Sequence, residues 1–145
     1  MYDTSTNFLI VHEWAYGLTE VAHILSLGLV IGLIALVDLR LLGVGIAGAT
    51  PARLVRATIL GVVVGLVVAV TSGLLILSTD PIRYFGHPVM RLKLVLLLAA
   101  LVFHFTIHNR VALGSYPRAV GPAVAAISLV LWVSIVFSGI FYAFT

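Results

Sequence analysis

The chain has 145 residues, of which 62% are hydrophobic and 9% are charged, with a formal net charge of +3. Soluble domains are about 45–50% apolar and roughly 25% charged, so this composition excludes a water-soluble fold and requires lipid around most of the chain. Cysteine is absent, which excludes disulfides, thiolate metal sites and cysteine nucleophiles.

Four apolar runs follow one another along the chain, at residues 14–42, 54–77, 88–110 and 122–144. Each is longer than the roughly 20 residues that an α-helix needs to cross about 30 Å of hydrocarbon. Backbone groups in lipid must be satisfied within their own segment, which favours helices. The sequence therefore predicts an all-α protein: residues 1–145 as one domain, an integral membrane four-helix bundle in direct contact with the lipid bilayer.

The basic residues predict how the bundle is oriented. Five cations flank the first and third connections, and three lie on the side of the second connection and the termini: Arg40, Arg53, Arg56, Arg110 and Arg118 against Arg83, Arg91 and Lys93. Cytoplasmic loops carry the excess of Lys and Arg, so both termini are expected on the outer side, most simply of a bacterial inner membrane. The cations are thus topology signals, and a nucleic-acid partner is not expected.

Ionisable residues inside the predicted spans are informative, because each costs about 2.5–3.5 kcal/mol at mid-bilayer on insertion scales. Glu20 and Asp38 are eighteen residues apart, five turns at about 3.6 residues per turn, so they share one face of the first helix, with His23 close to it. Lys93 and His104, eleven residues apart, share a face of the third helix. Both polar faces should turn away from lipid.

We expect these two faces to pack against each other. Near the end that holds the termini, Glu20 would meet Lys93 or Arg91. At the opposite end, Asp38 or Arg40 would meet His104 or His108. In a structural interpretation these are contacts that set the register of two helices, without further chemistry: Glu20, Lys93, Asp38, Arg40 and His108.

Five histidines in a chain without cysteine suggest a ligand role, because imidazole is the usual protein ligand of haem iron and a common ligand of other metals. His23 lies one turn from Glu20, a carboxylate able to orient an imidazole. His104 lies at a different height in the membrane, so His87 is the remaining partner for His23, and two arginines could pair with haem propionates. The predicted haem b site comprises His23, His87, Arg83 and Arg91.

Two other functions are compatible with the same residues. One is handling or transport of a metal ion, copper above others, by imidazole, carboxylate and thioether groups, a softer set than magnesium or calcium prefers: His23, Glu20, Met90 and His104. The other is a non-catalytic accessory or anchor subunit, without a cofactor, in a homo-oligomer or a larger membrane complex. No catalytic residue is predicted, because the chain lacks a Ser/His/Asp spacing, an H-E-x-x-H motif and a phosphate loop.

Several stretches resemble an uncharacterised family of small bacterial four-helix membrane proteins: EVAH at 20–23, VDLRLLG at 37–43, TSGLL at 71–75, then Pro81, Tyr84 and Lys93. That family is itself similar to the membrane domain of copper-resistance D-type proteins and, more distantly, to b561-type cytochromes. The resemblance extends from the first helix into the third, and E-x-x-H followed by D-L-R-L-L-G is its most specific part. It implies a haem b or copper role by analogy. A typical b-type cytochrome supplies two histidines at matched depth for each haem, which this sequence does not evidently do.

The orientation can be tested with reporter fusions at Thr145 and Ser115. We expect a periplasmic reporter to be active at Thr145 and a cytoplasmic reporter at Ser115, because the excess of Lys and Arg lies on the side of Ser115. Activity of a cytoplasmic reporter at Thr145 would reverse the orientation.

Overall fold

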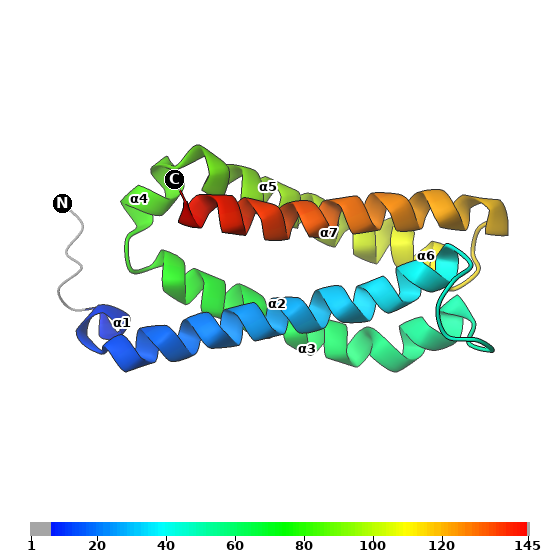
Figure 1. Ribbon diagram of the computed structural model, residues 1–145, viewed down its shortest axis with the longest axis horizontal. Helices are drawn as coiled ribbons and strands as arrows, with labels where there is room; N and C mark the ends of the chain where they lie inside the picture. Colours follow the sequence, from blue (N-terminus) through cyan, green and yellow to red (C-terminus); the bar gives the residue numbers. More distant parts are fainter. Residues whose placement is uncertain (1–6, 145) are drawn as a thin grey trace.

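Four long helical segments make up most of the computed structural model, which describes residues 7–144 (Figure 1). The third segment is composite, because a π-helical turn interrupts it near its end. Within the described residues every regular element is helical. The long elements are α2 (Glu13–Leu41), α3 (Pro51–Leu77), α5 (Pro88–Phe103) continued by η1 (His104–His108) and α6 (Asn109–Ala112), and α7 (Gly121–Ala143). The short ones are α1 (Phe8–Val11), α4 (Pro81–Gly86) and η2 (Arg118–Val120).

The four helical segments are long and apolar enough to cross a membrane, which confirms the prediction of an all-α integral membrane protein. Their limits differ from the predicted ones by a few residues. Helix α3 starts at Pro51 and not near residue 54, because the Thr50 hydroxyl accepts a hydrogen bond from the Arg53 amide and proline suits the first helical position. The third segment extends past Arg110 to Ala112.

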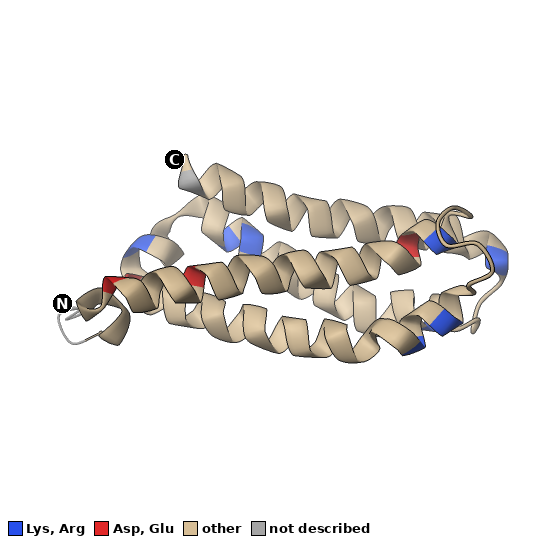
Figure 2. Cartoon of the chain, turned by 60° about the horizontal axis from the view of Figure 1, so that its bottom comes forward, with Lys and Arg blue, Asp and Glu red and all other residues tan. Residues whose placement is uncertain are grey.

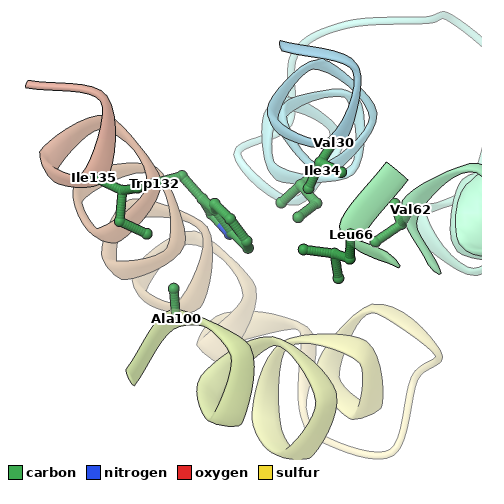
Figure 3. Close-up of a cluster of buried hydrophobic side chains, with 7 residues drawn as sticks. All are labelled: Val30, Ile34, Val62, Leu66, Ala100, Trp132 and Ile135. Atoms are coloured by element: carbon green, nitrogen blue, oxygen red, sulfur yellow. The ribbon is translucent and has the colours of Figure 1, made fainter. Parts of the chain in front are cut away.

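The helices form two hairpins, α2 with α3 and α5 with α7, which meet mainly where α2 packs against α7 (Figure 1). An apolar layer lies between them, with buried side chains from all four segments. Figure 3 shows the Trp132 ring pointing from α7 toward Ile34 and Leu66. This apolar layer consists of Val30, Ile34, Val62, Leu66, Ala100, Trp132 and Ile135.

Charged residues gather toward the two ends of the bundle (Figure 2). We call one end the arginine end, since it carries the connections that Arg40, Arg53, Arg56, Arg110 and Arg118 flank. The other is the terminal end, because α1 and the last turn of α7 lie there (Figure 1). Large exposed apolar side chains such as Leu60 cover the rest of the surface, as contact with lipid requires. Which end faces the cytoplasm stays a prediction.

Glycines on α3 allow it to approach α2 closely. A Cβ added at Gly65 would lie 2.7 Å from Val30 Cγ2, and one at Gly61 would lie 2.7 Å from Leu33 Cδ1. The matching pair on α2 behaves differently: a Cβ at Gly28 or Gly32 would meet nothing within 4 Å. Of the two Gly-x-x-x-Gly pairs in the sequence, the one on α3 therefore forms the helix–helix contact.

We expect Gly65→Ala to lower the free energy of unfolding by about 1–3 kcal/mol, because Val30 is fully buried and has no room to move. Thermal or denaturant unfolding of the detergent-purified protein measures this effect. The matched control is Gly28→Ala, which adds the same methyl group in open space on the partner helix. Equal effects of the two substitutions would show that the α2–α3 contact is not close-packed at Gly65.

Candidate functional site

A fully buried hydrogen-bonded cluster joins three helical elements near the arginine end. His108 Nε2, on η1, lies 2.7 Å from Asp38 Oδ1 on α2. The Ser128 hydroxyl on α7 donates to the other carboxylate oxygen, Oδ2, over 2.8 Å. All three side chains are at most 1% exposed. A proton must lie between the imidazole and the carboxyl group, whether the imidazole donates to a carboxylate or the protonated acid donates to the imidazole.

A second imidazole lies directly beside this hydrogen bond. The His104 ring stacks on His108, with centroids 4.8 Å apart, and the edge of Trp132 faces it at 6.5 Å. His104 is 3% exposed, yet neither of its ring nitrogens has a hydrogen-bond partner among the described residues. The same holds for His108 Nδ1. Because buried polar atoms are nearly always bonded, these three nitrogens call for an explanation.

The local backbone accounts for the position of the two imidazoles. His104–His108 form a single π-helical turn between α5 and α6. Such turns are rare, are inserted singly into α-helices, and occur frequently at functional sites. Both histidines bracket this turn and face the bundle interior, while Phe105, Thr106 and Ile107 between them are exposed. We call Asp38, His104, His108, Ser128 and Trp132 the Asp38 cluster.

His23 lies toward the terminal end, in contact with small residues of α3. Its Nδ1 is 2.8 Å from the Ala69 carbonyl oxygen and 3.1 Å from the Ser72 hydroxyl. A Cβ at Gly73 would lie 3.0 Å from the ring, so glycine makes room for the imidazole. Since a carbonyl oxygen only accepts, Nδ1 carries the proton and Nε2 keeps a free lone pair. The packing against α3 therefore sets the tautomer of His23.

The expected ion pair of Glu20 with Lys93 or Arg91 is wrong. Within residues 7–144, Asp38 and His108 form the one ion pair with N···O within 4 Å. Glu20 is exposed, and the Lys93 ammonium lies beside Gly139 of α7, where an added Cβ would be 3.3 Å away. The reason is that α2 packs mainly against α3 and α7. It makes few contacts with α5, the helix that carries Lys93 and Arg91. Among the residues that the structure describes, the hydrogen bond that joins the two polar faces is the one between Asp38 and His108.

The remaining predicted contacts are distributed over the two ends. The Arg40 Nε donates to the Ala49 carbonyl in the connection after α2, so Arg40 meets neither histidine. His87 caps α5, with Nδ1 accepting from the Val89 amide over 3.3 Å, and its ring lies edge-on to Tyr142 at 5.0 Å. Arg83 and Arg91 are exposed and Met90 is half-buried. In the described chain no hydrogen bond, ion pair or ring contact joins these four residues to His23: Arg83, His87, Met90 and Arg91.

The predicted metal ligands do not come together. No three His, Asp or Glu side chains of residues 7–144 form a group that could hold a metal ion. His104 stacks on His108 at the arginine end, whereas His23 contacts Ala69 and Ser72 toward the terminal end. Within the described residues His23 and Glu20 therefore do not join His104 in one ligand group, and His104 belongs to the Asp38 cluster instead.

Sequence reasoning missed Ser128 and Trp132 of the Asp38 cluster. The available signal was weak: a hydroxyl within an apolar span often bonds to another helix. Ser138, on the same helix, instead donates to the carbonyl of Ile135 in its own helix, so the residue type alone does not identify the partner.

Comparison with protein-family models, curated proteins and solved structures finds no match to this chain.

We expect Asp38→Ala to lower the free energy of unfolding by about 3–5 kcal/mol, because it leaves the buried His108 ring and Ser128 hydroxyl without their partner. The double substitution Asp38→Ala with His108→Ala should cost clearly less than the sum of the single effects. Unfolding of the detergent-purified variants gives the three values. Asp80→Ala is the control, since that exposed cap of the short α4 is worth no more than about 1 kcal/mol. Additive effects would contradict the coupling of Asp38 and His108.

Proposed function

We propose that this small integral membrane protein is a haem b-binding electron-transfer module, with His23 as an axial ligand. The observation that carries the proposal is the hydrogen bond from His23 Nδ1 to the Ala69 carbonyl. Ligand histidines typically donate their second ring N–H to a carbonyl or carboxylate, which fixes the ring and raises the basicity of the ligating nitrogen. In His23 this arrangement leaves Nε2 for the iron.

The surroundings of His23 fit a bound porphyrin in two further respects. Gly73 keeps the α3 side of the ring clear, and a side chain there would press on the imidazole. Lys93 on α5 is half-buried, with its ammonium beside Gly139 of α7, whereas Arg83 and Arg91 are exposed. The ammonium of Lys93 is therefore a better partner for a haem propionate than the exposed Arg83 or Arg91. A bound haem would supply one-electron redox chemistry, and the chain would orient it and exclude water.

The second axial position is not assigned to His87. That imidazole is held by the amide of Val89 and by the ring of Tyr142, and it has no contact with His23. We therefore propose that His23 is the one histidine of this chain that would hold the haem. Residence in a bacterial inner membrane, with the termini outside, is part of the same proposal and rests on the distribution of arginines.

Copper is the second candidate, because the same Nε2 of His23, next to the exposed carboxylate of Glu20, could bind a metal ion. It would need further ligands from outside this region, since no three-residue ligand group exists within residues 7–144. An accessory or anchor role without any cofactor is the third candidate, and the fully satisfied Asp38 carboxylate favours it as a purely structural contact.

The test is an absorption spectrum of the detergent-purified full chain, oxidised and dithionite-reduced, after expression with haem and copper supplied. We expect haem b bands in the wild type. His23→Ala should abolish or shift them, because it removes the axial ligand, while the protein still inserts and keeps its helical circular dichroism. His12→Ala and His104→Ala are the controls and should leave the bands unchanged.

Each other outcome is informative. A wild type with bound copper and no haem bands would replace the haem proposal by the copper proposal, provided that His23→Ala releases the metal. A wild type with neither would overturn both and favour the accessory role. Haem bands that survive His23→Ala would show that another residue is the ligand.

A further inference from the structure

The hydrogen bonds of the Asp38 cluster do not neutralise the negative charge that an ionised Asp38 would carry. Asp38 and His108 are 0% exposed, and His104 is 3% exposed. An ionised Asp38 beside two neutral imidazoles would leave one net negative charge away from water, which is costly unless a positive charge compensates it. The nearest arginine on the same helix, Arg40, is directed to the Ala49 carbonyl instead.

Within residues 7–144 no other element supplies the compensating charge. On α7 the cluster faces Ser128 and Trp132, which are both neutral. On α3 Thr58, which lines a small cavity together with His104, is neutral, and its hydroxyl donates to the Leu54 carbonyl of its own helix. On α6 Asn109 is neutral and Arg110 is exposed. One additional proton, held as an imidazolium–carboxylate pair or as a carboxylic acid beside an imidazole, makes the cluster neutral.

A small cavity next to His104 offers a place for water. It has a volume of ≈ 10 Å³ and lies between α2, α3 and the π-helical turn. A cavity of roughly 10–15 Å³ measured in this way accommodates a single water molecule, provided that polar groups line it. Here the polar lining residues are His104, Asn109 and Thr58, and both ring nitrogens of His104 lack a protein partner.

We propose that the Asp38 cluster is a proton-binding site that exchanges one proton with the arginine end through a water molecule held beside His104. The proton that lies between His108 Nε2 and Asp38 Oδ1 stays in place, the additional proton is taken up by the same pair, and the hydronium ion that delivers it is left as water. His108 Nδ1, which has no protein partner, is the atom open to protonation once Nε2 is engaged with Asp38. This site is independent of any haem at His23, from which the apolar layer separates it.

Nuclear magnetic resonance tests the proton count on the full chain in lipid nanodiscs, with ¹⁵N-labelled histidine and ¹³C-labelled aspartate. At neutral pH we expect Asp38 and His108 together to hold one proton more than a carboxylate beside a neutral imidazole. Raising the pH should remove that single proton. In Asp38→Asn the additional proton should be lost, whereas Asp80→Asn, an exposed control, should retain it. An ionised Asp38 beside two neutral imidazoles in the wild type at neutral pH would overturn the proposal.

Water-edited spectra of the same samples test the route. We expect magnetisation to pass from water to the His104 ring in the wild type. Val55→Leu should abolish this transfer, because Val55 lines the cavity and is buried, so an added methylene fills the space. Val63→Leu is the matched control, since Val63 is 41% exposed to lipid on the same helix. Absence of the transfer in the wild type, or its persistence in Val55→Leu, would contradict the water-mediated exchange.

Discussion

The carboxyl group of Asp38 holds the two halves of this bundle in register. It sits on the first hairpin, and both of its oxygens are bonded to the second, one to His108 on η1 and the other to Ser128 on α7. Apolar side chains favour one register in a membrane only through close packing, because lipid tails solvate an apolar helix face about as well as a neighbouring helix does. A buried carboxyl group tolerates only the arrangement that supplies its partners, since an unpaired one is far more costly.

Two polar regions lie at different depths, with an apolar layer between them. On α2, His23 and Asp38 are fifteen residues apart, or about 22 Å along the helix at 1.5 Å per residue. Val30 and Ile34 lie between them and are at most 1% exposed. The two regions are therefore separate. His23 is half-buried, whereas Asp38 and His108 are fully buried.

The π-helical turn at His104–His108 explains why the Asp38 cluster contains ring nitrogens without a hydrogen-bond partner. It places His104 and His108 one over the other, so only His108 reaches Asp38. A purely structural contact would need one imidazole and one carboxyl group, yet the helix carries a second buried imidazole with no protein partner. Retaining that group in the interior is unfavourable without water or a proton to satisfy it, which is the physical basis for assigning the cluster a role beyond packing.

The sequence alone determined the class of fold and the residues of interest. Four apolar runs of sufficient length can only be membrane helices, because backbone groups in lipid must bond within their own segment. Helical periodicity also placed Asp38 on an inward face, and the structure puts it against His108. These conclusions follow from composition and local geometry, which neighbouring helices do not alter.

Only the tertiary structure decided which inward faces meet. Helix α2 packs against α3 and α7, so Glu20 is left exposed and does not pair with Lys93. Helical periodicity describes one helix at a time and cannot specify its neighbour. The π-helical turn at His104–His108 and the partner of Ser128 were equally hidden, because both depend on contacts between segments far apart in the sequence.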